Sequence, residues 1–318
     1  MPSPDPDQTP DPSDDTPLRE VDPTILHDAR AHDTRSARPV PPGLHLIATP
    51  IGAARDITLH ALDLLAGADI LAAEDTRSLR KLMEIHAIPV RNRPVLAYHD
   101  HNGAAMRPRI SAALEAGKSI VYASEAGTPL VADPGFQLAR SVISDGYPLH
   151  SAPGPSAVLA ALTVAGLPSD RFCFMGFAPA QGGARKHFLN DAANIPATLI
   201  FYESPKRIHR FLTELCEIMG PDRQAALCRE LTKKHEEVLR MTLGEMADVL
   251  ADRSMKGEIV LVVDRAPPVT ANADDLDHAL ARAMADMTLK EAVAHVTAEL
   301  GLPRRVVYQA ALARGKAQ

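Results

Sequence analysis

Short apolar runs alternate with helical patterns through residues 44–165, and this alternation constrains the fold more than any other feature of the chain. The apolar runs predict strands at 44–48, 69–73, 95–98, 119–123 and 148–151. Helical patterns lie at 59–66, 79–86, 104–116, 136–144 and 155–165. Strands separated by helices pair in parallel and need helices on both faces of the sheet. The sequence therefore predicts an α/β unit with a mainly parallel sheet.

A second unit begins after residue 168, where strands and helices no longer alternate regularly. Predicted strands lie at 172–177, 198–202, 225–229, 238–242 and 258–263, and predicted helices at 184–192, 208–219 and 245–251. Strands without a crossover helix between them pair most easily in antiparallel fashion, so this unit predicts a mixed sheet. A linker at 266–273 precedes helical patterns at 275–285, 289–300 and 303–313. The predicted parts are an α/β domain (43–168), a second α/β domain (169–265) and a helical module (274–316).

Residues 1–42 differ from the rest of the chain in composition. They hold ten of the 27 Pro residues, nine acidic residues and only four Arg. Such a segment cannot bury enough apolar surface to offset the entropy of ordering it, so it predicts a disordered, acidic tail. Because the net charge of the whole chain is −6, the rest of the chain is close to neutral. A near-neutral body does not indicate nucleic-acid binding by itself, although it leaves room for a local basic patch.

Several classes of protein are disfavoured by what the sequence lacks. No apolar run approaches the ~18–20 residues of a membrane span, and the first residues have no basic and apolar segments of a secretory signal. Cys173, Cys216 and Cys228 have no metal-type or redox-type spacing, so they predict buried thiols in a cytoplasmic protein. The sequence also lacks a G-x-G-x-x-G fingerprint and a P-loop, which argues against a nicotinamide oxidoreductase and a P-loop NTPase.

Gly and Pro are concentrated at the ends of predicted strands. The densest segment, 124–135, reads SEAGTPLVADPG and follows the strand at 119–123. ATPIGA at 48–53 and APGPSA at 152–157 are similar turns. The carboxyl ends of parallel strands meet at one edge of a sheet, where ligands bind. Together the three turns predict a cleft lined by backbone, with helix N-termini available to a polar cofactor.

Polar motifs follow other strands, and each has a plain structural alternative. Glu74 and Asp75 could orient a hydroxyl or act as a base, or Asp75 or Thr76 could cap the next helix. His99 and His101 lie in a loop that could touch substrate or form a capped turn. A metal site there is disfavoured, because no third ligand with clear spacing is visible.

Mixed charges follow two strands of the second domain, at 201–207 and 229–234. Their cations could contact a polyanion in the cleft, or they could form solvated salt bridges. The C-terminal helices predict a helix–turn–helix, with Thr288 as a cap and Gly301 at the turn. Arg304 and Arg305, at the start of the last helix, favour a module that grips RNA; the alternative is a helical bundle packed on the body.

A series of motifs, in order along the chain, resembles one family. The motifs are TPIG at 49–52, AEDTR at 73–77, HDHN at 99–102, AGTPL at 126–130, DPG at 133–135, PGP at 153–155, GLPSDRF at 166–172, FYES at 201–204 and RELTK at 229–233. The chain resembles the 16S rRNA methyltransferases within the tetrapyrrole methylase (class III methyltransferase) superfamily. The departures are small: Ala53 stands where this family usually has Asn, and Glu125 where it has Asp.

The resemblance implies a two-domain α/β fold with S-adenosylmethionine bound in the cleft between the domains. It implies methyl transfer to the ribose 2′-oxygen of a cytidine in the decoding region of 16S rRNA, by a homodimer and without a metal. The cofactor contacts that it implies are Pro50, Gly52, Gly127, Thr128, Val131, Ser156, Ala157, Tyr202 and Gly257.

This chemistry needs residues that take the proton of the 2′-hydroxyl and residues that hold the RNA phosphates. The candidate general bases are Glu74, Asp75, Asp133 and His99, in that order. The candidate phosphate contacts are Arg77, Arg207, Arg229, Lys233 and Lys234, together with Arg304 and Arg305 in the helical module.

Two other functions are weighed against this one. The same fold could methylate a small tetrapyrrole, but the charged loops of the second domain and the C-terminal helices favour RNA, since a small ring needs no extra grip. The chain could instead be a DNA-binding regulator that senses a ligand. The near-neutral charge and the cleft crowded with Gly and Pro argue against that role.

Overall fold

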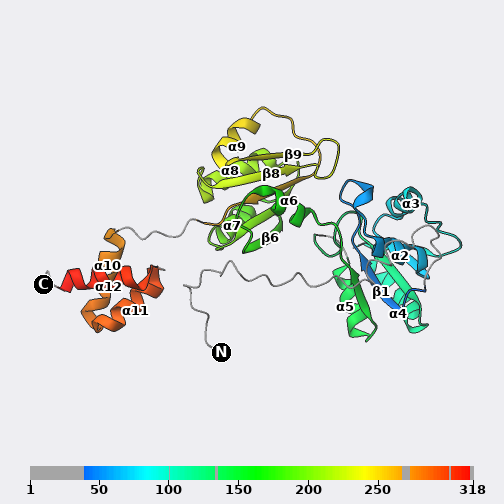
Figure 1. Cartoon of the computed structure of the whole chain (residues 1–318), viewed down its shortest axis with the longest axis horizontal. Helices are drawn as coiled ribbons and strands as arrows, with labels where there is room; N and C mark the ends of the chain where they lie inside the picture. Colours follow the sequence, from blue (N-terminus) through cyan, green and yellow to red (C-terminus); the bar gives the residue numbers. More distant parts are fainter. Residues whose placement is uncertain (1–38, 100, 133–134, 267–272, 301, 316–318) are drawn as a thin grey trace, which may run out of the picture.

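The structure, a computed structural model, describes residues 39–99, 101–132, 135–266, 273–300 and 302–315. It contains two five-stranded sheets, followed by a group of three helices at the C-terminus (Figure 1). The predicted tail lies almost wholly outside the described residues, as does most of the predicted linker. Within the described ranges, no helix has the length and apolar character of a membrane span.

The first sheet confirms the predicted parallel architecture. Its strands are β1 (Gly43–Ile47), β2 (Ile70–Ala73), β3 (Val95–Ala97), β4 (Ser119–Ala123) and β5 (Leu149–Ala152). They are ordered β3-β2-β4-β1-β5, and every neighbouring pair is parallel. All five residues of the central strand β4 are buried, as expected for a parallel strand covered on both faces.

Helices cover both faces of this sheet. On one face lie α2 (Leu59–Gly67) and α3 (Thr76–Ile85), and on the other lie α4 (Gly103–Glu115) and α5 (Phe136–Ser144). Successive residues of β4 show the division, because Val121 belongs to the core with α2 and α3, whereas Tyr122 belongs to the core with α4 and α5.

The second sheet is mixed, as predicted. Its strands are β6 (Phe172–Phe177), β7 (Thr198–Glu203), β8 (Gln224–Arg229), β9 (Glu237–Thr242) and β10 (Ile259–Val263), in the order β6-β7-β10-β8-β9. β6 and β7 are parallel, whereas β10 is antiparallel to both of its neighbours and β9 is antiparallel to β8. The core on one side of this sheet includes α7 (Gly182–Ala193), α8 (Ile208–Met219) and α9 (Leu243–Leu250).

The helix α6 (Ala157–Ala165), predicted within the first domain, packs against the second sheet. Val158 and Ala161 of α6 are buried with Ala226 of β8 and Val260 of β10. Ile51, from the turn after β1, belongs to the same apolar cluster. Val131, from the turn after β4, is partly buried against the same cluster. The two domains therefore share a core around α6.

A capping side chain sets where α3 begins. The Asp75 carboxylate accepts a hydrogen bond from the Arg77 N–H at 2.7 Å, so Asp75 caps α3. For that reason α3 begins at Thr76, three residues before the start predicted from its apolar pattern. The helix α6 begins at Ala157 and not two residues earlier as predicted, although the side chain of its N-cap residue Ser156 makes no capping hydrogen bond.

The C-terminal helices α10 (Ala273–Asp286), α11 (Leu289–Leu300) and α12 (Arg304–Gly315) have a core of their own. Thr288 lies at the start of α11 and caps it as predicted: its hydroxyl accepts from the Glu291 N–H, and the Glu291 carboxylate accepts from the Thr288 N–H at 3.0 Å. The predicted turn residue Gly301 lies outside the described residues.

A buried ion pair holds α7 against α8. The Arg185 guanidinium donates two hydrogen bonds to the Glu214 carboxylate, and both side chains are buried. These hydrogen bonds lower the pKa of the Glu214 carboxyl to about 2. A carboxyl whose pKa is lowered by folding stabilises the fold above its unfolded pKa, and this stabilisation is lost as the pH falls towards the folded value.

We expect Glu214→Gln to lower the free energy of unfolding by about 3–5 kcal/mol at pH 7, because Arg185 is left buried without its counter-charge. Urea denaturation measures this change. The control is Glu217→Gln, which removes the exposed Lys186–Glu217 pair and should cost less than about 1 kcal/mol. The deficit of Glu214→Gln should shrink as the pH falls from 4.5 towards 2, and a pH-independent deficit would contradict the ion-pair account.

Candidate functional site

Three turns at the carboxyl ends of β1, β4 and β5 converge on one edge of the first sheet. Thr49 and Gly127 exchange two backbone hydrogen bonds of 3.0 Å, which tie the turn after β1 to the turn after β4. The Thr49 hydroxyl also donates to the Ser124 carbonyl oxygen. The Thr128 hydroxyl donates to the Pro155 carbonyl oxygen at 2.9 Å, and this hydrogen bond connects the turn after β5 to the turn after β4. The turns predicted to form one cleft are thus held together by hydrogen bonds.

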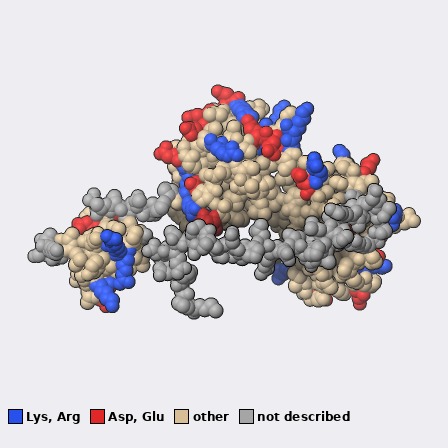
Figure 2. Space-filling model, in the orientation of Figure 1, with Lys and Arg blue, Asp and Glu red and all other residues tan. Residues whose placement is uncertain are grey.

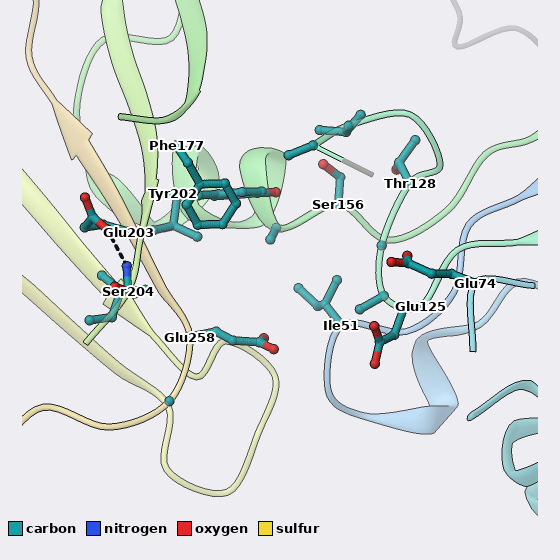
Figure 3. Close-up of a pocket in the computed structure, with 18 of the residues that line it drawn as sticks. Ile51, Glu74, Glu125, Thr128, Ser156, Phe177, Tyr202, Glu203, Ser204 and Glu258 are labelled. Carbon is teal, nitrogen blue, oxygen red and sulfur yellow. Dashed lines mark hydrogen bonds between the residues drawn. The ribbon is translucent and has the colours of Figure 1, made fainter. Parts of the chain in front are cut away.

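A cavity of about 650 Å³ lies between these turns and the second sheet (Figure 3). From the first domain it is lined by Ile51, Glu74, Ser78, residues 125–128, Val131, Ala132, Ser156 and Ala157. From the second domain it is lined by Phe177, residues 202–205 and residues 257–260. Ligand pockets commonly measure ~300–1,000 Å³, so this cavity has room for a ligand of nucleoside size.

Gly127 shapes the wall of the cavity on the first-domain side. Its φ is +81°, a left-handed conformation that favours glycine. A Cβ atom at this position would lie 3.4 Å from Ile51 Cγ2. The N–H and C=O of Gly127 already bond to Thr49, so they are not free to bind a ligand. Ala157, the first residue of α6, lines the cavity at the N-terminus of this helix.

Besides Glu203, which forms an ion pair with Arg207 at 3.1 Å, three carboxylates line the cavity. Glu74 follows β2 and Glu125 follows β4, whereas Glu258 immediately precedes β10 in the second domain. Figure 3 shows the first two on one side of the cavity and Glu258 on the other. Lys233 forms an ion pair with Glu258 at 2.9 Å, but no described residue forms one with Glu74 or Glu125. This lining favours a ligand that carries positive charge or hydroxyl groups.

Aromatic side chains form part of the second-domain wall. Tyr202 packs edge-on against Phe174 and Phe177, with ring centroids 4.8 Å and 5.5 Å away. Burial and the nearby Glu258 carboxylate raise the pKa of Tyr202 to about 12, so this side chain is neutral at ordinary pH. Phe177 is 57% exposed and presents an apolar face beside the cavity.

Eight of the residues predicted for the site line this cavity. They are Glu74, Gly127, Thr128, Val131, Ser156, Ala157, Tyr202 and Gly257. Pro50 and Gly52 flank the lining residue Ile51 but do not line the cavity themselves. Gly52 lies against Thr232 and Lys233 of the second domain.

The other candidate bases are not brought to the cavity. Asp75 caps α3, and its hydrogen bonds with Arg77 lower the pKa of that carboxyl to about 2. His99 does not line the cavity, and its buried Nδ1 has no hydrogen-bond partner among the described residues. Asp133 lies outside the described residues. In the part of the chain that the structure describes, no group of three or more His, Cys, Asp or Glu side chains could hold a metal ion.

The candidate phosphate contacts fall into two groups. Four are paired with carboxylates: Arg77 with Asp75, Arg207 with Glu203, Arg229 with Glu237, and Lys233 with Glu230 and Glu258. Lys234, Arg304 and Arg305 are exposed, and none of them forms an ion pair with another described residue. These three therefore have charge available for a polyanion.

The sequence did not single out Phe177 or Glu258 as cavity residues, and it marked Glu125 only as a departure from a motif. A search limited to residues that follow strands misses Glu258, because this residue lies immediately before β10. β10 is antiparallel to β7, and Ile259 pairs with Glu203, so the start of one strand lies beside the end of the other. The sequence feature that could have indicated Glu258 is a charged residue directly before an apolar run in a predicted mixed sheet.

Comparisons with known proteins bear on most of the chain. Residues 43–247 match the family of tetrapyrrole (corrin/porphyrin) methylases, and residues 270–315 match the RsmI C-terminal HTH domain. The chain is 45% identical over 277 residues to ribosomal RNA small subunit methyltransferase I of Mesorhizobium japonicum, covering 86% of this chain and 92% of that protein. It is 40% identical over 271 residues to the protein of the same name from Xylella fastidiosa, covering 84% and 98%.

Solved structures share the fold. A diphthine synthase aligns with a TM-score of 0.55 at 14% identity, over 70% of this chain and 89% of that one. Uroporphyrin-III C-methyltransferase from Thermus thermophilus, solved with S-adenosyl homocysteine, aligns with a TM-score of 0.50 at 18% identity, over 70% and 98%. The match of residues 43–247 to the family and the 40–45% identity to the two relatives show that the chain belongs to the tetrapyrrole (corrin/porphyrin) methylase family, in the group of ribosomal RNA small subunit methyltransferase I.

Proposed function

We propose that the chain transfers a methyl group from S-adenosylmethionine to the ribose 2′-oxygen of a cytidine in 16S rRNA. One observation carries the proposal: both domains line a single cavity in a chain whose 40–45% identical relatives are named for small-subunit rRNA methylation. The cytidine and its 2′-oxygen follow from the family resemblance of the motifs.

The residues around the cavity fit S-adenosylmethionine. Ile51, Val131 and Val260 offer apolar surface to the adenine ring, and Glu125 offers acceptors to hydroxyl or ammonium groups. The carboxylate lining suits a positively charged sulfonium. The N-terminal amides of α6, at Ala157, suit a carboxylate. A ligand of this composition matches each part of the lining.

The bound cofactor supplies a methyl group that its positive sulfur already activates. The chain has to orient the ribose hydroxyl and receive its proton. Glu74 is the proposed general base, because it lines the cavity and has no ion-pair partner among the described side chains. A Glu74 carboxylate oxygen would accept the proton of the 2′-hydroxyl when the methyl group passes from sulfur to the ribose oxygen. Asp75 is poorly suited to this role, since a carboxyl with a pKa of about 2 is a weak base.

A substitution at Gly127 tests where the cofactor binds. Valine at a φ of +81° would press against Ile51 and fill part of the cavity, so we expect Gly127→Val to remove measurable binding of S-adenosylmethionine in calorimetry while the protein stays folded. The control is Gly146→Val, because Gly146 has a similar φ of +77°, has nothing within 4 Å of its Cβ position and lies outside the cavity. Unchanged affinity in Gly127→Val would contradict this placement.

Glu74→Gln tests the general base. We expect kcat on 30S subunits to fall by ~10²–10⁴-fold, because amide oxygen is a poor proton acceptor, while the affinity for S-adenosylmethionine stays close to wild type. Asp75→Asn is the matched control, since asparagine also caps helices and should preserve kcat. Equal losses of kcat in the two variants, or none in Glu74→Gln, would argue against Glu74 as the base.

RNA binding is proposed for the exposed cations. Arg304, Tyr308 and Leu312 are spaced four residues apart on α12 and so share one face. Tyr308 is 45% exposed, and its ring can stack on an unpaired base beside the charge of Arg304. Figure 2 shows Lys and Arg side chains exposed on the face of the C-terminal helical group in view. Lys234 adds a cation from the second domain.

Salt dependence measures these contacts. Removing two single-strand phosphate contacts should make the plot of log affinity against log salt shallower by about 1.4. We expect this change in the double variant Arg304→Ala/Arg305→Ala, measured by filter binding to 16S rRNA. Arg282→Ala is the control, because Arg282 is exposed but already paired with Glu299 at 2.8 Å. A slope equal to that of the wild type would mean that α12 does not contact RNA phosphates.

Methylation of a tetrapyrrole is the second candidate, since the matched family is named for corrins and porphyrins. The match of the C-terminal helices and the named relatives favour rRNA. Radiolabelled S-adenosylmethionine, offered with 30S subunits or with uroporphyrinogen, separates the two. Label on a cytidine ribose supports the proposal, whereas label only on the tetrapyrrole would replace it.

The family resemblance also supports a homodimer that acts in the cytoplasm on the small ribosomal subunit. Sedimentation of the purified chain tests the dimer. Transfer to naked 16S rRNA and to assembled 30S subunits, compared side by side, shows which form is the substrate.

A further inference from the structure

The turn after β1 and a loop of the second domain approach each other closely at Gly52. A Cβ atom on Gly52 would lie 2.6 Å from Lys233 Cγ, 2.6 Å from Thr232 Oγ1 and 2.9 Å from the Leu231 carbonyl oxygen. Only glycine permits so close an approach without a shift of the backbone. The Ala53 N–H donates a hydrogen bond to the Thr232 hydroxyl oxygen at 3.1 Å, between residues 179 positions apart.

The same loop is fixed to the start of β10. The Glu230 carboxylate accepts hydrogen bonds from the Glu258 N–H at 2.9 Å and from Lys233 Nζ at 3.0 Å. Lys233 Nζ also donates to the Glu258 carboxylate at 2.9 Å. Gly257 has a φ of +87°, and a Cβ atom there would lie 2.5 Å from Glu230 Cδ, so the Glu230 side chain occupies space that only glycine leaves open.

Apolar packing accompanies these polar contacts. Ile51 and Leu231 are buried in the same cluster as Val260 of β10. Ile51 lines the cavity from the first domain, and Gly257 and Val260 line it from the second. The loop itself does not line the cavity. It therefore connects two opposing walls from outside the space that they enclose.

We propose that residues 230–233, here called the strut, set the width of the cleft by holding the start of β10 against the turn after β1. Thr232 is the positioning residue, because its hydroxyl makes the polar contact with the first domain. Glu230 and Thr232 have φ values of +52° and +62°, which residues other than glycine adopt rarely and only where surrounding contacts determine them. This role rests on the proposed cofactor site, and it places Lys233 inside the protein's own network and not on RNA phosphates.

Amide exchange at Ala53 tests the strut without any ligand. In the full chain without cofactor, the Ala53 N–H is expected to be protected in the wild type and in Thr232→Ser, which keeps the hydroxyl. Exchange should be about 3- to 10-fold faster in Thr232→Val, which keeps the branched shape but loses the acceptor. Thr213→Val is the matched control, since the Thr213 hydroxyl donates only to the His209 carbonyl oxygen of its own helix. An equal exchange rate of the Ala53 amide in Thr232→Val and in the wild type would overturn the proposal that the strut holds the two domains together.

Cofactor affinity tests the consequence for the cleft. The calorimetric Kd for S-adenosylmethionine should rise about 3- to 10-fold in Thr232→Val and return towards the wild-type value in Thr232→Ser. The KM for the cofactor should follow the Kd, with kcat at saturating cofactor unchanged. A general structural defect would instead lower kcat and would not be rescued by serine.

The two measurements separate the strut from the proposed function. If the wild-type chain binds no S-adenosylmethionine, the proposed function fails, and the exchange rate of the Ala53 amide still decides whether the strut holds the domains together. If exchange accelerates in Thr232→Val while affinity does not change, the contact exists but does not set the cleft, and the inference is overturned.

Discussion

The pair of hydrogen bonds between Thr49 and Gly127 is the contact on which the site depends, because it joins turns that follow different strands. Strand ends in a parallel sheet lie near one another, but the turns that follow them are more mobile than the strands. Gly127 permits the contact at a left-handed φ and leaves no side chain in the cavity. The helix α6 then continues from the third turn into the core of the second sheet, so the edge that carries the proposed cofactor site also joins the domains.

Acidic side chains line the cavity, whereas basic side chains that form no ion pair with another described residue lie on the surface of the C-terminal helices. Carboxylates of Glu74, Glu125 and Glu258 line the cavity, where a sulfonium donor would bind. Many cations near the second-domain strand ends are neutralised by acidic partners, whereas those at the start of α12 are not. A near-neutral chain can thus offer a negative pocket to one ligand and a separate positive surface to RNA phosphates. Net charge alone would not reveal either.

Much of the fold could be predicted because buried parallel strands require apolar runs, and helices must separate them. The packing of α6 could not, since an apolar helix does not indicate which of two sheets will cover it. The cavity was predicted well where turns follow strand ends, as at Thr128 and Ser156. Prediction was less good within a turn: Ile51 lines the cavity while its neighbours Pro50 and Gly52 do not, because spacing in a turn does not determine direction.

The most direct test of the account is a crystal structure of the chain with S-adenosyl homocysteine. The account predicts that the ligand lies in the cavity between the two sheets, in contact with the turns after β1, β4 and β5 and with the start of β10. Ligand density at another surface, or density in the cavity that touches only one domain, would contradict it.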